Sequence, residues 1–319
     1  MVANYGNPLQ EQKDLLAGNA FVVLAKKVLI VSGEERLTWL NNMFSQKLDE
    51  LAPMVSTEAL WLDMNGRILR DFHIVDDGQS CYLITFSAGF DELVTAMQRL
   101  VFRSKVTLDH KPEHKVIGSF TKGLPGLINW KDPWPETSEG GFRYGARPEH
   151  WDYFESVVLE LPELQEAREL ALTALRIAAH RPQGPDEIDE RSIPHEYDWL
   201  ATAVHLKKGC YRGQETVAKV HNLGHPPRRL VFVHLDGSQH ELPEAGAEIL
   251  AEEVIGKLTS VGQHFESGPI ALGLVKRNFT GTHVKVKLSN GEEVSGTLEE
   301  IVPPDAGAVV DVSNFRKKN

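Results

Sequence analysis

The sequence predicts an α+β body followed by a small all-β domain. Up to about residue 227, strand-like runs alternate irregularly with amphipathic helical patterns, which favours α+β over repeated βαβ units. After Arg228, short apolar runs separated by turn residues follow one another, a pattern typical of a small barrel or sandwich. We therefore expect a body over residues 1–227 and an all-β domain over residues 228–319, both with enough apolar residues for a core.

The first helix of the body is predicted to begin after Ser32. Ser32 and Glu35 have the spacing of a capping box, in which two side chains bond backbone N–H groups at a helix start. Apolar residues then recur on one side of the expected helix, at Leu37, Leu40, Phe44 and Leu48.

A β-hairpin is predicted next. Glu58–Met64 and Ile68–Val75 are strand-like, and Asn65-Gly66 between them is a strong hairpin signal. The apolar run Cys81–Phe86 predicts a further strand, and Phe90–Phe102 predicts an amphipathic helix. We expect Cys81 to pack in the core as a small hydrophobic residue.

Less regular segments follow in the second half of the body. Lys131–Glu139 carries two prolines and several polar residues, which predicts a surface loop. Pro162–Ala179 contains a helix with an apolar stripe, and Arg181–Pro194 is irregular. Gln214–Asn222 can form a short helix that ends at Gly224.

Six strands are predicted for the C-terminal domain. Val284, Val286 and Leu288 alternate with lysines, and Asn290-Gly291 supplies a hairpin turn. The expected strands are Leu230–Leu235, Ala247–Ala251, Gly256–Val261, Ile270–Val275, His283–Leu288 and Val294–Ile301.

Composition argues against several classes of protein. The formal net charge of −11 argues against extensive direct nucleic-acid binding, which needs an extended basic face. The two cysteines, Cys81 and Cys210, are too few for a disulfide framework or for the thiolates of an iron–sulfur cluster. No apolar run is long enough to span a bilayer. We expect a cytoplasmic protein that does not enter membranes.

The most informative segment surrounds Cys210. From Lys207 to Arg229 the chain has six Lys or Arg residues and a single acid, Glu215. Nearby cations and a helix N-terminus both stabilise a thiolate, and Cys210 lies just before an expected helix. The residues alone leave two readings open, a reactive thiol or a small residue in a basic turn.

Other catalytic patterns are weaker. His195-Glu196 could begin a zinc-protease helix, but Trp199 stands where the second histidine belongs. Cys210, His221 and His225 could be zinc ligands, yet no Cys-x-x-Cys pair accompanies them. A Cys–His nucleophile pair stays open, and no glycine-rich phosphate-binding motif occurs.

Lys208-Gly209-Cys210-Tyr211-x-Gly213-Gln214-Glu215 resembles the signature of the YgfZ family of folate-binding proteins, relatives of the glycine-cleavage T-protein. Val28–Asp49, Trp61–Asp71, Leu175–Ile177 and Ile255–Arg277 resemble further segments of that family, in the same order. The resemblance implies a three-lobed T-protein-like fold with a C-terminal antiparallel β-barrel. It also implies tetrahydrofolate or a derivative as a cofactor in a central hole.

The resemblance implies site residues as well. The family's functional thiol falls on Cys210, and the arginine of its Leu-Arg-Ile element falls on Arg176. The acid near the folate in T-protein relatives falls at Asp71, with Asp63 as a second candidate. Ala178 stands where relatives carry a glutamate expected to bond the pterin ring. The other motif residues implied at the site are Lys208, Gly209, Tyr211, Gly213, Gln214 and Glu215.

Two classes of function follow from the resemblance. The first is a folate-binding accessory protein, active as a monomer, that supports assembly or repair of iron–sulfur enzymes, including tRNA-modifying ones, through Cys210. Its partners would be folate and the iron–sulfur client enzymes or assembly proteins. The second is a tetrahydrofolate-dependent aminomethyltransferase of glycine-cleavage type, which relies on a carboxylate and not on this thiol. A binding module with degenerate chemistry is a third reading, because of Ala178.

Overall fold

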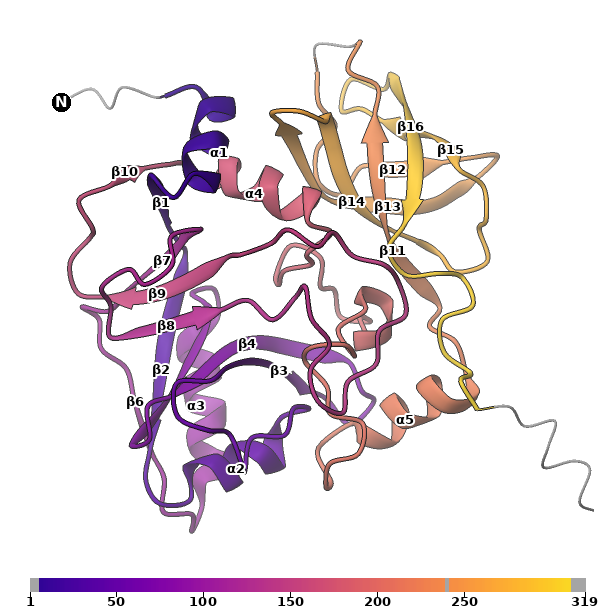
Figure 1. Ribbon diagram of the computed structural model, residues 1–319. Helices are drawn as coiled ribbons and strands as arrows, with labels where there is room; N and C mark the ends of the chain where they lie inside the picture. Colours follow the sequence, from indigo (N-terminus) through magenta and orange to yellow (C-terminus); the bar gives the residue numbers. More distant parts are fainter. Residues whose placement is uncertain (1–5, 239–240, 311–319) are drawn as a thin grey trace, which may run out of the picture.

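The computed structural model describes residues 6–238 and 241–310, and it contains two open β-sheets and a closed barrel (Figure 1). Helices are few, and most of them lie against these β units. The predicted α+β class with a C-terminal barrel is confirmed. One large apolar core extends through both sheets and the barrel, because it includes Leu60, Trp130 and Leu272 from the three units.

The first sheet has the strand order β3-β4-β5-β2-β6. The residues of one face point into a core that includes Leu29, Phe72 and Cys81, under helices α2 and α3. Every strand pair in this sheet is antiparallel, and the turn between β3 and β4 contains the predicted Asn65-Gly66. The elements are β2 (Lys26–Ser32), α2 (Arg36–Met43), β3 (Ser56–Leu62), β4 (Ile68–Asp76), β5 (Ser80–Phe86), α3 (Phe90–Val101) and β6 (Thr107–Asp109).

The second sheet has the order β10-β1-β7-β9-β8 and is antiparallel except where β1 pairs with β10. Helices α1 and α4 pack against each other, and α4 also lies along the barrel. The elements are α1 (Pro8–Leu16), β1 (Ala20–Val23), β7 (Lys115–Ser119), β8 (Ile128–Lys131), β9 (Phe154–Val158), β10 (Gln165–Glu166) and α4 (Glu169–Ala178).

The barrel closes because β11 pairs with β14 on one side and with β16 on the other. Alternate residues of each strand fill its interior, among them Val231, Val286 and Leu298. Small residues let the barrel meet α4, since a methyl group on Gly262 would lie 3.1 Å from the Cα of Ala174. All six predicted strands occur, as β11 (Arg228–Leu235), β12 (Glu248–Leu250), β13 (Val254–His264), β14 (Gly268–Lys276), β15 (His283–Lys287) and β16 (Glu293–Glu300).

The segment from residue 181 to residue 213 runs through the interior, and its first part, 181–194, is irregular as predicted. Ser192, His195 and Asp198 in this segment are fully buried. Arg228 fixes it to the start of the barrel by ion pairs with Asp189 (2.6 Å) and Glu196 (2.8 Å). Its only regular element is the short 3₁₀-helix η1 (Pro194–Tyr197), and α5 (Gln214–Leu223) follows it and ends at Gly224 as predicted.

Two local predictions were wrong. The capping box does not form, because Ser32 is the last residue of β2 and its hydroxyl bonds Ser80 (2.7 Å). Helix α2 begins at Arg36 without a side-chain cap from Glu35, and it ends before Phe44. The expected surface loop at 131–139 is in part internal, since Trp134 is fully buried.

Among the described residues, no helix is both long and apolar enough to cross a membrane. The division of the chain at residue 227 stays a prediction, although the first barrel strand begins at Arg228.

Candidate functional site

Cys210 lies on an exposed loop just before α5, while Cys81 is buried in the first sheet. No atom lies within 4 Å of the position that a methyl group on Gly209 would take, so the loop beside the thiol is open. Burial raises the pKa of the Cys81 thiol well above its ordinary value, and the nearby Asp76 charge adds to this effect. The accessible thiol of this protein is therefore Cys210.

Lys208 anchors this loop to helix α2 and the turn after it. Its buried ammonium group donates hydrogen bonds to the carbonyl oxygens of Asn41 (2.5 Å), Phe44 (2.8 Å) and Gln46 (2.7 Å). Two of these carbonyls belong to the end of α2, where a helix leaves carbonyl groups without internal partners. Burial lowers the Lys208 pKa to about 8, although Asp49 opposes the shift. Lys208 therefore has a structural contact that its sequence position did not reveal.

Tyr211 and Gly213 fix the other end of the loop. The Tyr211 ring is buried and lies 5.3 Å from the Lys208 ammonium group. Gly213 has a φ of 84°, and a methyl group on it would lie 2.6 Å from the carbonyl oxygen of Asp63. Gln214 donates to the Lys208 carbonyl (3.2 Å), whereas the side chain of Glu215 is exposed. The motif is thus a short rigid support that leaves Cys210 exposed.

Asp63 belongs to the β3–β4 turn against which Gly213 packs. Its carboxylate accepts hydrogen bonds from the backbone N–H groups of Asn65 (2.8 Å) and Arg67 (2.8 Å). Both bonds stay within its own turn, an arrangement common for Asp. The geometry gives Asp63 the role of a turn residue.

Asp71, on β4, lines an open cleft of about 540 Å³. Asp71 is 6% exposed. Its carboxylate accepts no hydrogen bond from any of the residues that the structure describes. A methyl group on Gly184 across the cleft would lie 2.6 Å from the Asp71 Oδ1. The remaining lining includes Arg70, Phe86, Ile188 and Glu190. The Asp71 carboxylate faces this cleft without a protein donor among the described residues, so it can accept a hydrogen bond from a ligand there.

Arg176 does not reach the Asp71 cleft. It is buried on α4, where its guanidinium donates to Ser260 of the barrel (2.7 Å) and to the carboxylate of Glu187 (3.2 Å). Ser260 also bonds Glu187. Burial raises the Glu187 pKa, and Arg176 opposes this rise. Arg176 therefore joins α4, the irregular segment and the barrel, and Ala178 near it packs against the large core.

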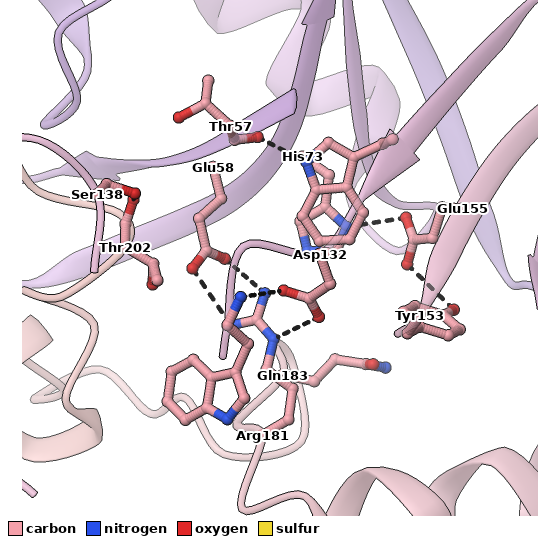
Figure 2. Close-up of polar contacts among 12 residues, drawn as sticks. Thr57, Glu58, His73, Asp132, Ser138, Tyr153, Glu155, Arg181, Gln183 and Thr202 are labelled. Carbon is pink, nitrogen blue, oxygen red and sulfur yellow. Dashed lines mark hydrogen bonds and ion pairs between the residues drawn. The ribbon is translucent and has the colours of Figure 1, made fainter. Parts of the chain in front are cut away.

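Sequence reasoning missed a buried network of charged side chains between the two sheets (Figure 2). Arg181 lies between two carboxylates, those of Glu58 (2.5 Å) and Asp132 (3.0 Å). Burial alone would lower the Arg181 pKa, but the two carboxylates raise it above its ordinary value. Acidic and basic residues at inward strand positions are the only sequence signal for such a network, and this signal does not identify the pairs.

A second part of the network supports β4 beside the cleft. The Glu155 carboxylate pairs with Lys26 (2.5 Å) and with His73 (2.8 Å), whose ring stacks on Trp130 at 3.7 Å. Burial alone would raise the Glu155 pKa, but these two partners lower it to about 2. His73 is two residues from Asp71 on the same strand, so both side chains lie on one face of the sheet.

The network leaves little free space. Its internal cavity is about 10 Å³ and is lined by His73, Glu155, Arg176 and Arg181. That volume matches about one water molecule. The Asp71 cleft, by contrast, falls within the range of roughly 300–1,000 Å³ typical of small-molecule sites. A ligand of pterin size therefore fits the Asp71 cleft and not the network.

No protein-family model matches this chain. A putative chloroplastic transferase from Arabidopsis thaliana is 31% identical over 138 residues, which are 41% of this chain and 29% of that protein. The chain thus spans less than a third of that relative's length. The glycine-cleavage aminomethyltransferase T from Bartonella henselae superposes with a TM-score of 0.72, over 92% of this chain and 89% of that one, at 16% identity. The chain has the T-protein fold. A narrower membership, in the YgfZ family, is not shown by these similarities.

Folate is the cofactor that the sequence resemblance implied, and the Asp71 cleft has features that fit part of it. A pterin carries N–H donors, and Asp71 offers a buried acceptor with no protein donor among the described residues. Phe86 lines the same cleft and offers an aromatic ring for packing. Ala178 supplies no second carboxylate. Asp71 would therefore be the main polar contact of a bound pterin.

Proposed function

We propose that this protein is a folate-binding accessory protein that supports the assembly or repair of iron–sulfur enzymes, including tRNA-modifying ones, through the Cys210 thiol. The observation that carries the proposal is the construction of the Cys210 loop. Lys208, Tyr211 and Gly213 are buried or tightly packed, yet the cysteine between them is exposed. A rigid support around an accessible thiol suits chemistry on another molecule.

The reduced folate of this proposal binds in the Asp71 cleft. Asp71 accepts the N–H donors of the pterin, and Phe86 packs against the ring. The Glu155–His73 pair holds β4 two residues from Asp71, on the same face of the sheet, and so keeps Asp71 in place. When bound, tetrahydrofolate supplies a carrier for one-carbon units.

An aminomethyltransferase of glycine-cleavage type is the second candidate. It is favoured by the same carboxylate, because Asp71 is buried, lacks a hydrogen-bond partner among the described residues, and faces an open cleft. The similarity of the fold to aminomethyltransferase T agrees with this candidate as well. The two proposals differ in which residue is indispensable, Cys210 in the first and Asp71 in the second.

Anaerobic calorimetry with tetrahydrofolate tests the shared part of both proposals. We expect binding to the parent protein and to Asp63→Asn, since an Asn side chain can also cap the turn, and much weaker binding to Asp71→Asn. Ligand at one hundred times its dissociation constant should stabilise the fold by about 2.7 kcal/mol. Absence of heat and of a melting shift with the parent protein would rule out the folate site.

Complementation of a deletion strain separates the two candidates. Cys210→Ser should fold normally but fail to restore iron–sulfur enzyme activity, because serine lacks the thiol. Asp71→Asn should retain part of the activity. Full complementation by Cys210→Ser, together with strong aminomethyl transfer by the parent protein in vitro, would favour the transferase instead.

A further inference from the structure

Exposed cations lie on the Cys210 loop and on the two elements next to it, α5 and the β3–β4 turn. Lys207 and Arg212 lie on its loop, and Lys219 lies on α5; all three are exposed. Arg67 lies in the β3–β4 turn, which packs against α5. A methyl group on Gly66, the residue before Arg67, would lie 3.1 Å from the Cβ of Thr216 in α5. Arg67 is therefore counted with these cations. We call Arg67, Lys207, Arg212 and Lys219 the basic face.

The basic face contains fewer cations than the sequence suggested, but the charges of its members are not used in ion pairs within the described part of the fold. Three of the six cations counted between Lys207 and Arg229 are used inside the fold, since Lys208 bonds carbonyl groups, Arg228 forms ion pairs and Arg229 is buried. No member of the basic face forms an ion pair with another described residue. Four exposed lysines of the barrel, in contrast, each pair with an acid: Lys257, Lys276, Lys285 and Lys287.

The basic face has an exposed methionine beside it and two arginines among its four cations. Met64, in the same turn as Arg67, is 70% exposed. Methionine and arginine are enriched in protein–protein interfaces, where lysine is depleted. Within the part of the chain that the structure describes, the acids on the loop, helix and turn that carry the face are Glu215, which is exposed, and Asp63, whose carboxylate is bonded within its own turn; Asp49 lies close enough to act on the Lys208 pKa. The face therefore keeps a positive potential in a chain whose formal net charge is −11.

We propose that the basic face docks an acidic surface of a partner protein and so brings a sulfur of that partner to Cys210. The proposal rests on Cys210 being the working thiol. A protein is favoured over RNA because binding a phosphate backbone needs many cations along an extended path, and the rest of this acidic chain repels a long polyanion. A compact acidic patch needs only the cations that are present.

Thiol–disulfide exchange with a synthetic peptide measures this docking directly. The probe is a short glutamate-rich peptide whose single cysteine forms a mixed disulfide with 5-thio-2-nitrobenzoate. The Cys210 thiolate attacks the peptide sulfur and forms a new disulfide with it. The old S–S bond breaks, and thionitrobenzoate leaves with its electron pair and is detected by its colour. The proton of Cys210 goes to the buffer, so no external oxidant is required.

We expect the parent protein to react with the acidic peptide at least about tenfold faster than with a peptide that has glutamine in place of glutamate. The advantage should shrink as salt is raised above about 0.15 M, because salt screens exposed charges. Arg212→Glu/Lys219→Glu should abolish it. The matched control, Lys115→Glu/Lys122→Glu, changes the net charge equally on β7 and the loop after it, and should react like the parent.

Three outcomes would overturn the proposal. The first is equal rates with the acidic and neutral peptides, and the second is equal loss of rate in the two double variants. The third is tight binding of total tRNA that is lost in Arg212→Glu/Lys219→Glu, with no preference for the acidic peptide, which would make the face an RNA site. Iodoacetamide labelling of Cys210 separates these failures from a failure of the proposed function. A thiol that labels normally but shows no charge preference contradicts the docking surface alone.

Discussion

Gly213 and Gly66 pack backbone against backbone, so that a methyl group on Gly213 would lie 2.9 Å from the Cα of Gly66. One glycine stands in the cysteine motif and the other in the turn between β3 and β4. The contact places the start of α5 directly on the first sheet, and it explains why both positions need a residue without a side chain.

Replacement of Gly213 by alanine should therefore destabilise the protein more than its backbone conformation alone requires. Gly246 offers a matched control, because its φ of 91° is similar but no atom lies within 4 Å of an added methyl group. Both alanine variants carry the left-handed penalty of about 1–2 kcal/mol. Gly213→Ala should lose about 1–3 kcal/mol more, from overpacking. Urea unfolding measures the difference, and equal losses would show that the contact is not tight.

The Lys208 anchor predicts a second difference between neighbouring residues. Lys208→Met leaves three buried carbonyl groups without their donor and should lower the free energy of unfolding by about 1–3 kcal/mol. Lys207→Met, at an exposed position, should change it by less than about 0.5 kcal/mol. Thermal and urea unfolding of the two variants give the comparison. A similar effect of both changes would contradict the anchor.

Arg181 provides a test of the buried network. Arg181→Met leaves the carboxylates of Glu58 and Asp132 buried without a cation and should cost about 3–5 kcal/mol. Arg191→Met is the control, since that arginine forms only an exposed pair with Glu190 at 3.7 Å. If Arg181→Met unfolds at nearly the same urea concentration as Arg191→Met, the network contributes little to stability.

Local features of the fold were predictable from the sequence, whereas the polar contacts were not. The Asn65-Gly66 turn, the burial of Cys81 and the six barrel strands depend on residues close together in the chain, where turn chemistry and apolar alternation are informative. The Arg181–Glu58 pair joins residues 123 positions apart, and no local pattern indicates it. The capping box failed for the same reason, because pairing of Ser32 with β5 prevailed over local capping.

The same distinction applies to the candidate site. The motif around Cys210 could be identified in the sequence, and the structure shows that its thiol is exposed, while the role of that thiol stays a prediction. The bonds of Lys208 to residues up to 167 positions away were not visible. Similarly, the sequence left Asp63 as a second candidate beside Asp71. Only the fold shows that one carboxylate bonds its own turn and the other lines a cleft.

Alkylation should distinguish the two cysteines. In the native protein, iodoacetamide near neutral pH should label Cys210 and leave Cys81 unmodified, because Cys81 is fully buried and burial raises its pKa. Both cysteines should react in urea. Mass spectrometry of the digested protein identifies the labelled site, and Cys210→Ser serves as the control that should take up no label when folded. Equal native labelling of both residues would contradict the burial of Cys81.

His195 predicts a specific loss of stability in acid. Its ring is fully buried and Nε2 donates to the carbonyl oxygen of Val217 in α5 (3.0 Å), which leaves Nδ1 without a partner among the described residues. Burial lowers the His195 pKa to about 3, and His221 adds to this. An unfolded histidine has a pKa of about 6.5, so between these values the unfolded state binds more protons than the folded state.

The stability contributed by neutral His195 is therefore present above pH 6.5 and decreases as the pH falls towards 3. Between about pH 7 and pH 5 this group alone should lower the free energy of unfolding by about 2 kcal/mol. At neutral pH, His195→Gln should be less stable than the parent. Between pH 7 and pH 5, however, its free energy of unfolding should fall by about 2 kcal/mol less than that of the parent. Urea unfolding at several pH values measures both curves. The exposed His234→Gln should keep the pH dependence of the parent, and an unchanged dependence in His195→Gln would show that His195 is not held neutral under α5.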